Sequence, residues 1–173
     1  MKTLFRVEPI SKSHDRETFD CGVESLNIFL RRFARQNNER GLGRTYVAVK
    51  ENDAKIYGYY TISSSAFDFE LAPENLPRYP VPMVHLGRLA VDRSAQGERL
   101  GRSLLFHALQ RSVDLTEQIG IYAVEVYALN DEARRFYLSF GLTELKDDRL
   151  HLYITIKKIK GMLSSDSDDN STK

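Results

Sequence analysis

The pattern of hydrophobic and polar positions in the first third of the chain predicts strands around one helix. Residues 4–10 alternate between apolar and polar side chains, as in a half-buried strand. Two β-rich runs, 46–50 and 56–64, flank the turn 51–54, where asparagine and aspartate tolerate turn dihedral angles. These two runs are therefore predicted to form a hairpin.

One amphipathic helix is predicted between the first strand and the hairpin. Four large apolar residues recur there at helical spacing and should bury one face: Leu26, Phe29, Leu30 and Phe33. A lone cysteine, Cys21, precedes this helix, and no histidine lies near it in sequence. We interpret it as a small buried hydrophobic residue and not as a nucleophile.

The second half of the chain alternates strands with helices. An apolar run ending at Val91 leads through a polar turn into a helix, predicted to end near Gly120. Residues 121–127 predict a central strand. Residues 130–142 predict a helix opened by Asn130 or by nearby acidic residues and closed by Gly141. Residues 145–156 predict a terminal hairpin. The long segment 66–82 carries four of the five prolines and predicts an irregular loop.

Composition favours one globular domain. The chain has 173 residues, of which 42% are hydrophobic and 28% charged, enough for one core and short for two. We expect a domain over residues 1–160 and a polar, disordered tail over 161–173. The net charge of +1 gives no global argument for nucleic acid. No Cys/His cluster has metal-ligand spacing, and no run predicts export or a membrane span, so we expect a cytoplasmic protein without a metal.

The segment from Gln96 to Gly101 is the main candidate for chemistry. It lies between the predicted strand and the helix, and its small residues let the backbone approach a ligand. The amides at a helix N-terminus have no intrahelical partners and attract phosphate. Many strand-to-helix turns look like this for packing reasons alone, so the segment by itself does not decide between a ligand site and a structural turn.

Several motifs resemble those of the GNAT N-acetyltransferases. The loop is similar to their acetyl-CoA motif, Gln/Arg-x-x-Gly-x-Gly/Ala, and the segment 133–142 is similar to their A-x-x-F-Y-x-x-F-G-L/F ending. The sequence L-G-R-L-A-V-D, the run G-Y-Y-T at 58–61 and a Phe-x-Cys-Gly pattern at 19–22 resemble one branch, the acetyltransferase toxins of toxin–antitoxin pairs. The resemblance spans residues 19–142. One position departs from it, because Arg99 stands where the motif has its first glycine, and we expect altered loop geometry there.

The resemblance implies an α/β fold with a mixed twisted sheet of about six to seven strands, helices on both faces, and splayed central strands that hold acetyl-CoA. It implies that the loop amides hold the pyrophosphate and that the preceding strand pairs with the pantetheine arm. The cofactor-binding residues expected from the motifs are Leu89, Ala90, Val91, Gln96, Gly97, Glu98, Arg99, Leu100, Gly101, Arg102, Asn130 and Phe136.

Tyr137 is the catalytic residue that the resemblance implies. A phenol with a pKa of about 10 stays protonated at neutral pH and can donate to a leaving thiolate with a pKa of roughly 8.5. No glutamate or histidine is singled out as a base by its position in the sequence. An α-amino group, with a pKa near 7.7–8.0, is partly neutral without help, whereas a lysine amine would need a base.

The resemblance to the toxin branch further implies that the acceptor is the α-amino group of an aminoacyl-tRNA, which would block translation. The tRNA contacts we consider are arginines, whose guanidinium groups bind phosphate in bidentate fashion: Arg31, Arg32, Arg35, Arg78 and Arg88. A solvated helix face is the other interpretation of this cluster. Such toxins are held inactive by a ribbon-helix-helix antitoxin and many form dimers. The alternatives are an acetyltransferase for a small-molecule amine or protein N-terminus, and a non-catalytic CoA-binding regulatory module.

Overall fold

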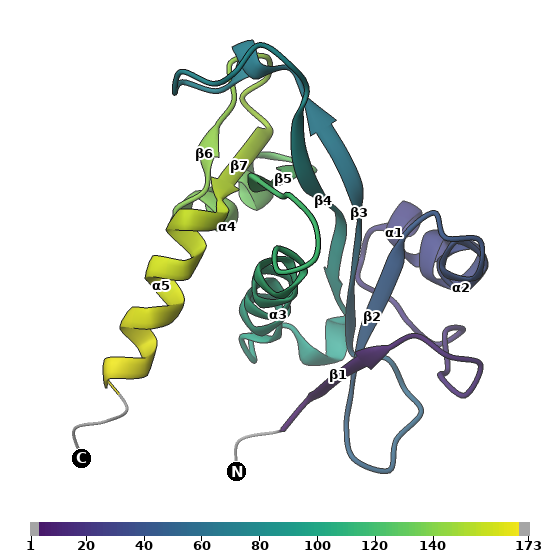
Figure 1. The fold of residues 1–173 in the computed structure, drawn as a ribbon. Helices are drawn as coiled ribbons and strands as arrows, with labels where there is room; N and C mark the ends of the chain where they lie inside the picture. Colours follow the sequence, from purple (N-terminus) through teal and green to yellow (C-terminus); the bar gives the residue numbers. More distant parts are fainter. Residues whose placement is uncertain (1–3, 170–173) are drawn as a thin grey trace. The chain divides into compact units, whose positions relative to one another are not determined.

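The structure of the protein is a computed structural model, which describes residues 4–169 (Figure 1). The seven strands form one mixed sheet, which confirms the predicted fold class, and their order is β1-β2-β3-β4-β5-β7-β6. The chain divides into two compact units, Met1–Ser63 with Leu86–Ala108, and Ser64–His85 with Leu109–Lys173. β3 (Gly58–Phe67), β4 (Val81–Val91) and α3 (Leu100–Leu115) each contribute residues to both units.

The predicted hairpin is present in the first unit. β1 (Arg6–Pro9) pairs antiparallel with β2 (Arg44–Val49), which pairs antiparallel with β3. The register places Tyr46 opposite Tyr60, and their rings stack with centroids 5.1 Å apart. Such cross-strand aromatic pairs stabilise a sheet.

The first helix differs from the single amphipathic helix predicted. α1 (Glu24–Ile28) passes into a π-helical turn, η1 (Phe29–Phe33), and then into α2 (Ala34–Glu39). In the π turn the amide of Ala34 donates to the carbonyl of Phe29, five residues earlier, so the buried face moves on by one residue. Ala34 is buried and Phe33 is 47% exposed, so the prediction that Phe33 belongs to the core is wrong.

Successive tyrosines of β3 face opposite sides of the sheet in the first unit. The hydroxyl of Tyr59 donates to the carbonyl of Leu26 in α1 at 2.8 Å, whereas that of Tyr60 lies 2.7 Å from Nδ1 of His107 in α3. Both tyrosines are fully buried. The alternation of a strand thus places α1 and α2 on one face and the N-terminal half of α3 on the other (Figure 1).

The Cys21 side chain lies at the edge of this core. It is half-buried, not fully buried as predicted, and its Sγ lies 3.6 Å from the carbonyl oxygen of Val23. Burial raises the pKa of the thiol, which favours the uncharged form. The structure therefore supports a packing role for Cys21.

The second unit is built on an antiparallel meander. β5 (Ala123–Tyr127) pairs with β7 (His151–Thr155), which pairs with β6 (Thr143–Glu144). The irregular segment predicted over 66–82 is shorter, because β3 continues to Phe67 and β4 begins at Val81, with the short η2 (Phe69–Leu71) between them. The carboxylate of Glu74 holds this loop, since it accepts from the hydroxyls of Tyr122 and Tyr153, each at 2.5 Å.

Helix ends are where the sequence-based boundaries were least accurate. α3 ends at Leu115, before the predicted Gly120. α4 (Asp131–Ser139) begins as predicted, because the side-chain oxygen of Asn130 accepts from the amide of Ala133 at 2.9 Å. Gly141 follows this helix with a φ of +87°, the left-handed conformation that commonly ends helices.

The C-terminal segment forms a helix. α5 (Ile156–Asp169) continues directly from β7, so the prediction of a disordered tail is wrong for residues 161–169. Residues 170–173 lie outside the described part of the chain. Across residues 4–169, no helix combines the length and apolar character needed to cross a membrane. Within the same range, no group of three histidine, cysteine or acidic residues is arranged to hold a metal ion.

Candidate active site

The candidate phosphate loop lies in the first unit and is anchored by Asp92. This aspartate ends β4 and precedes the short η3 (Arg93–Ala95). Its Oδ1 accepts from the amide and hydroxyl of Ser94, at 2.9 and 2.6 Å, and its Oδ2 accepts from the amide of Asp20 at 2.9 Å. Burial alone would raise the pKa of Asp92, but these hydrogen bonds outweigh it and the pKa is lowered. The carboxylate therefore stays ionised and fixes the start of the loop.

Gln96 provides the second anchor of the loop. Its Nε2 donates to the carbonyl of Val91 at 3.0 Å and to the carbonyl of Cys21 at 3.2 Å. The side chain of this motif residue thus ties the loop to the end of β4 and to the segment before α1. We infer that its contribution to a ligand comes through the backbone it holds in place.

The loop backbone is left-handed at two positions, Gly97 with φ +85° and Arg99 with φ +62°. A left-handed conformation costs a residue with a Cβ about 1–2 kcal/mol, which is why the motif has glycine where this chain has Arg99. Arg99 thus adopts a conformation that glycine adopts readily, and altered geometry of the loop stays a prediction.

The loop has the features that an anion requires. The side chains from Gln96 to Arg99 are exposed, and left-handed residues in a turn before a helix form the concave arrangement of amides that binds anions. Leu100, by contrast, is buried, so only its amide is available to a ligand. The guanidinium of Arg102 lies 5.5 Å from the ring centroid of Phe106. The geometry fits a diphosphate held by backbone amides.

The remaining residues predicted to bind the cofactor lie on β4 and at α4. On β4, Ala90 is buried while Leu89 and Val91 are half-buried. On α4, Phe136 is half-buried and its ring lies 5.2 Å from that of Tyr137, edge to face. Asn130 is exposed, and its side-chain oxygen is used by the helix cap.

Tyr137 lies near the end of α4 in the second unit and is 6% exposed. Burial raises the pKa of its phenol, and no charged neighbour contributes to the shift. The hydroxyl therefore stays protonated throughout the neutral range. Such a group is suited to donating a proton and unsuited to accepting one.

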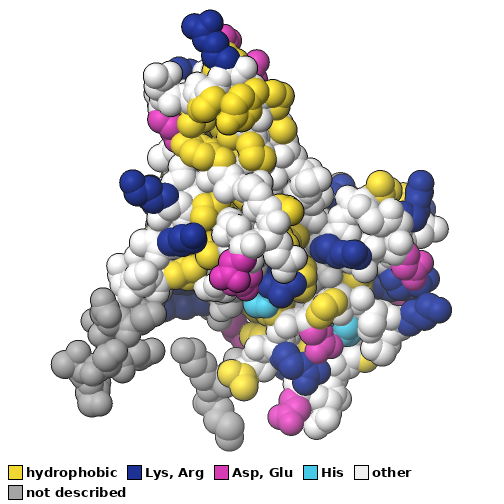
Figure 2. Space-filling model, in the orientation of Figure 1, with side chains coloured by type: hydrophobic (Ala, Val, Ile, Leu, Met, Phe, Trp, Pro, Cys, Tyr) yellow, Lys and Arg dark blue, Asp and Glu magenta, His cyan; other side chains and the backbone are white. Residues whose placement is uncertain are grey.

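The predicted tRNA-binding arginines differ in how firmly they are held. Arg31 forms an ion pair with Glu24 at 2.7 Å, and Arg35 forms one with Glu39. The guanidinium of Arg88 lies 3.7 Å from the ring centroid of Phe29. Arg32 and Arg78 are exposed. Figure 2 shows Lys and Arg side chains over the region of α1 and α2 with acidic side chains among them, so this surface is mixed in charge.

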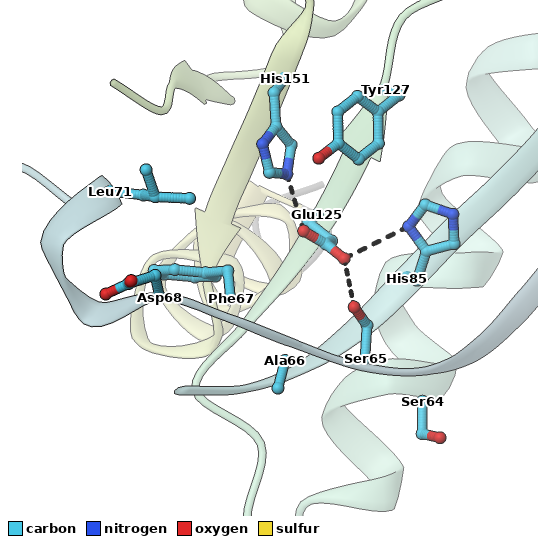
Figure 3. Close-up of a pocket in the computed structure, with 10 residues that line it drawn as sticks. All are labelled: Ser64, Ser65, Ala66, Phe67, Asp68, Leu71, His85, Glu125, Tyr127 and His151. Carbon is cyan, nitrogen blue, oxygen red and sulfur yellow. Dashed lines mark hydrogen bonds and ion pairs between the residues drawn. The ribbon is translucent and has the colours of Figure 1, made fainter. Parts of the chain in front are cut away.

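The structure brings together a second set of polar residues that sequence reasoning did not single out. They line a pocket of about 380 Å³ in the second unit (Figure 3). Glu125 of β5 lies at its centre and is 4% exposed. Its Oε1 accepts from the hydroxyl of Ser65 at 2.5 Å and lies 3.4 Å from Nδ1 of His85, while its Oε2 lies 2.7 Å from Nε2 of His151.

These contacts keep the Glu125 carboxylate ionised. Burial alone would raise its pKa, but the contacts with His85, Ser65 and His151 outweigh burial and lower the pKa to about 2. His151 lies between two carboxylates, because its Nδ1 is 2.8 Å from Oδ2 of Asp147. Both contacts are hydrogen bonds only when the imidazole carries a proton on each nitrogen. Glu125 and His151 thus line the pocket, and His151 connects Glu125 to Asp147, which is not among the lining residues.

One signal in the sequence could have revealed this cluster. Glu125 interrupts the strongly apolar run 121–127, where an alternating strand should bury it. A charged residue in a central strand is rarely buried without a partner. The partners Ser65, His85 and His151 come from three other strands, so no local spacing connects them to Glu125.

The fold and the loop together define a GNAT acetyltransferase. The model of the acetyltransferase (GNAT) family matches residues 9–142, and the chain belongs to this family. It is 37% identical over 158 residues to a tRNA-acetylating toxin of Mycobacterium tuberculosis (strain ATCC 25618 / H37Rv), covering 89% of this chain and 93% of that protein.

Two solved structures of the toxin AtaT are also similar. AtaT complexed with acetyl-methionyl-tRNAfMet matches with a TM-score of 0.87 and 30% identity, covering 92% of this chain and 99% of that one. A mutant AtaT with phenylalanine in place of a tyrosine, bound to acetyl-CoA and the C-terminus of the antitoxin AtaR, matches with a TM-score of 0.80 and 29% identity. That match covers 92% of this chain and 98% of that one.

The first prediction concerns acid stability. A carboxyl group with a folded pKa of about 2 and an ordinary pKa of 4.5 stabilises the fold above pH 4.5, and this contribution disappears as the pH falls from 4.5 to 2. We expect Glu125→Gln to be destabilised by about 2–3 kcal/mol at pH 7. The difference in the free energy of unfolding between wild type and Glu125→Gln should become smaller below pH 4.5. Urea unfolding at a series of pH values measures it. A difference that is constant with pH would contradict the assignment.

The second prediction concerns the loop. Because Arg99 is left-handed, Arg99→Gly should stabilise the ligand-free protein by about 1 kcal/mol, whereas Gly97→Ala should destabilise it by about the same amount. Thermal unfolding without ligand measures both. A loss of stability in Arg99→Gly would show that the arginine side chain makes a compensating contact.

Proposed function

We propose that the protein is an acetyl-CoA-dependent N-acetyltransferase that acetylates the α-amino group of an aminoacyl-tRNA and thereby blocks translation. The observation that carries this proposal is the likeness, over 92% of the chain, to AtaT complexed with acetyl-methionyl-tRNAfMet. The 37% identity to the tRNA-acetylating toxin supports the same substrate class.

Both backbone groups and side chains of this chain bind acetyl-CoA in this proposal. The amides from Gly97 to Gly101 take the diphosphate, and their geometry is held by Asp92 and Gln96. The backbone of Leu89 to Val91 pairs with the pantetheine arm and supplies an amide to the thioester oxygen. Acetyl-CoA supplies the activated acetyl group. Arg99 and Arg102 are exposed cations beside these amides and suit the phosphates.

Tyr137 is the proton donor in this proposal. When the amine attacks the thioester carbonyl, the carbon–sulfur bond breaks and the departing sulfur needs a proton. The pKa of Tyr137 is raised by burial, so its hydroxyl is protonated when the sulfur leaves. Several of the structures that match are of KacT or AtaT mutants in which a tyrosine is replaced by phenylalanine.

Arginines of the first unit are the proposed contacts for tRNA phosphates. Arg32 is exposed and can contact a phosphate directly. Arg31 and Arg35 must exchange their acidic partners for phosphate. Arg88 and Arg78 are the further candidates for tRNA contacts. Loss of the ion pairs with Glu24 and Glu39 is a cost that phosphate binding must offset, and exposed pairs of this kind are weak.

The proposal extends to partners and location. A toxin of this kind acts on charged tRNA in the cytoplasm and is held inactive by a cognate antitoxin, for which we propose a ribbon-helix-helix protein. AtaT is similar to this chain and has been solved bound to the C-terminus of the antitoxin AtaR. We propose a homodimer as the assembled form.

The third prediction tests the catalytic residue. Tyr137→Phe removes the proton donor and keeps the ring, so acetyl transfer to aminoacyl-tRNA should fall at least about 100-fold. Labelled acetyl-CoA with total charged tRNA measures transfer, and calorimetry should find the affinity for CoA unchanged. Tyr153→Phe, which removes a buried phenol bonded to Glu74 in the same unit, is the matched control and should keep most of the activity. Equal activity in Tyr137→Phe and wild type would remove Tyr137 from the mechanism.

The fourth prediction tests the tRNA surface. Replacing Arg31, Arg32 and Arg35 together by glutamine should weaken tRNA binding and lower the slope of log K against log salt by about 2 to 3. The control replaces three exposed lysines elsewhere: Lys146, Lys157 and Lys160. Filter binding across a salt series measures both variants. An identical slope in both would assign the arginines to a solvated helix face.

A further inference from the structure

We propose that His85 is the general base that deprotonates the acceptor amine, and that Glu125 positions it. This inference rests on the proposed function and adds a residue to it. His85 lies on β4 and lines the pocket around Glu125 (Figure 3). The sequence analysis assigned no base, so the role comes from the juxtaposition that the fold creates.

The two nitrogens of His85 have different surroundings. Nδ1 is buried and faces Oε1 of Glu125 at 3.4 Å, a long contact of the kind that tightens when substrate closes a site. Nε2 points away from Glu125 (Figure 3). It forms no hydrogen bond with any described residue, and it is not among the buried polar atoms that lack a partner. The His85 side chain is 30% exposed, so Nε2 is open to a ligand.

Glu125 determines which nitrogen carries the proton. An ionised carboxylate only accepts hydrogen bonds, so it favours the tautomer with hydrogen on Nδ1 and leaves the lone pair on Nε2. Contacts with two other side chains orient the carboxylate of Glu125. Its Oε2 faces His151, while its Oε1 accepts from the Ser65 hydroxyl and also faces His85. A carboxylate that orients an imidazole in this way occurs in catalytic triads.

The other groups around His85 favour a cationic acceptor. The rings of Tyr127 and His85 pack edge to face with centroids 6.2 Å apart, and Tyr127 also stacks on His151 with centroids 3.9 Å apart. Behind His151 lies Asp147, and Asp68 lines the pocket. The carboxylates of Glu125 and Asp147 outnumber the one imidazole between them, and the carboxylate of Asp68 adds to them. An ammonium group is attracted to such a site, and a phosphate is not.

The proposed step is balanced as follows. Nε2 of His85 takes one proton from the α-ammonium group, and the freed lone pair forms the carbon–nitrogen bond to the thioester carbonyl. As the carbon–sulfur bond breaks, Tyr137 gives its proton to sulfur and recovers one from the nitrogen, which becomes the amide. His85 then releases its proton to solvent. One ammonium and one thioester thus yield one amide, one thiol and one proton.

The fifth prediction uses chemical rescue. His85→Ala should lower kcat for acetyl transfer to aminoacyl-tRNA about 100- to 1000-fold and leave CoA affinity unchanged. Added imidazole should raise the kcat of His85→Ala at least about tenfold. This rescue should increase with pH, because the fraction of imidazole in its neutral form increases. The matched control is His14→Ala, because His14 also faces a glutamate, Glu8, at 2.7 Å. It should keep its activity and gain nothing from imidazole.

A second measurement is independent of turnover. In Glu125→Gln the amide can donate to Nδ1, so the proton of His85 should move to Nε2, as nitrogen chemical shifts report in the full-length protein. Ser65→Ala keeps the carboxylate and should keep the tautomer. If Glu125→Gln is unfolded, the wild-type spectrum still decides, because a His85 ring with hydrogen on Nε2 overturns the proposal.

The outcomes separate this inference from the function it rests on. If wild-type protein acetylates no aminoacyl-tRNA, the proposed function fails and the role of His85 falls with it. If wild type is active and His85→Ala matches it, or loses activity without imidazole rescue, the base assignment alone is overturned. Rescue confined to His85→Ala, together with the Nδ1 tautomer in wild type, supports it.

Discussion

The second unit depends on one buried negative charge, the carboxylate of Glu125. An uncompensated ion in this position would cost several kcal/mol, so its partners must be in place whenever the unit is folded. Those partners come from β3, β4 and β7, and a one-residue slip of β5 would turn Glu125 to the other face of the sheet. The charge therefore specifies the register of β5 as well as the chemistry of the pocket.

The first unit shows a different constraint, a loop whose conformation is fixed from outside. Asp92 and Gln96 hold its start with hydrogen bonds to the chain before α1 and to β4. Because these anchors determine the backbone, the loop keeps a left-handed residue even where glycine is replaced by Arg99. The departure from the motif thus places a residue with a Cβ in a strained conformation and adds a cation to the loop.

Sequence reasoning predicted most features that depend on neighbouring residues. The β2–β3 hairpin, the cap at Asn130 and the strand at 123–127 follow from local patterns and were predicted correctly. It failed at Phe33, where one π turn shifts the buried face, and at residues 161–169, where a polar segment continues a helix. It also missed His85, because the significance of that residue arises only when the sheet brings Glu125 beside it. Sites assembled across strands have no local period to reveal them.

The surroundings of the two proposed proton-transfer groups give them opposite roles. Burial without a charged partner raises the pKa of Tyr137, so this phenol reaches the reaction with its proton. Glu125 remains ionised at neutral pH because its pKa is lowered to about 2. In the neutral imidazole, an ionised acceptor facing Nδ1 of His85 favours the tautomer with its lone pair on Nε2. An apolar environment thus defines the acid and a buried carboxylate defines the base, so a single fold provides both at the same pH.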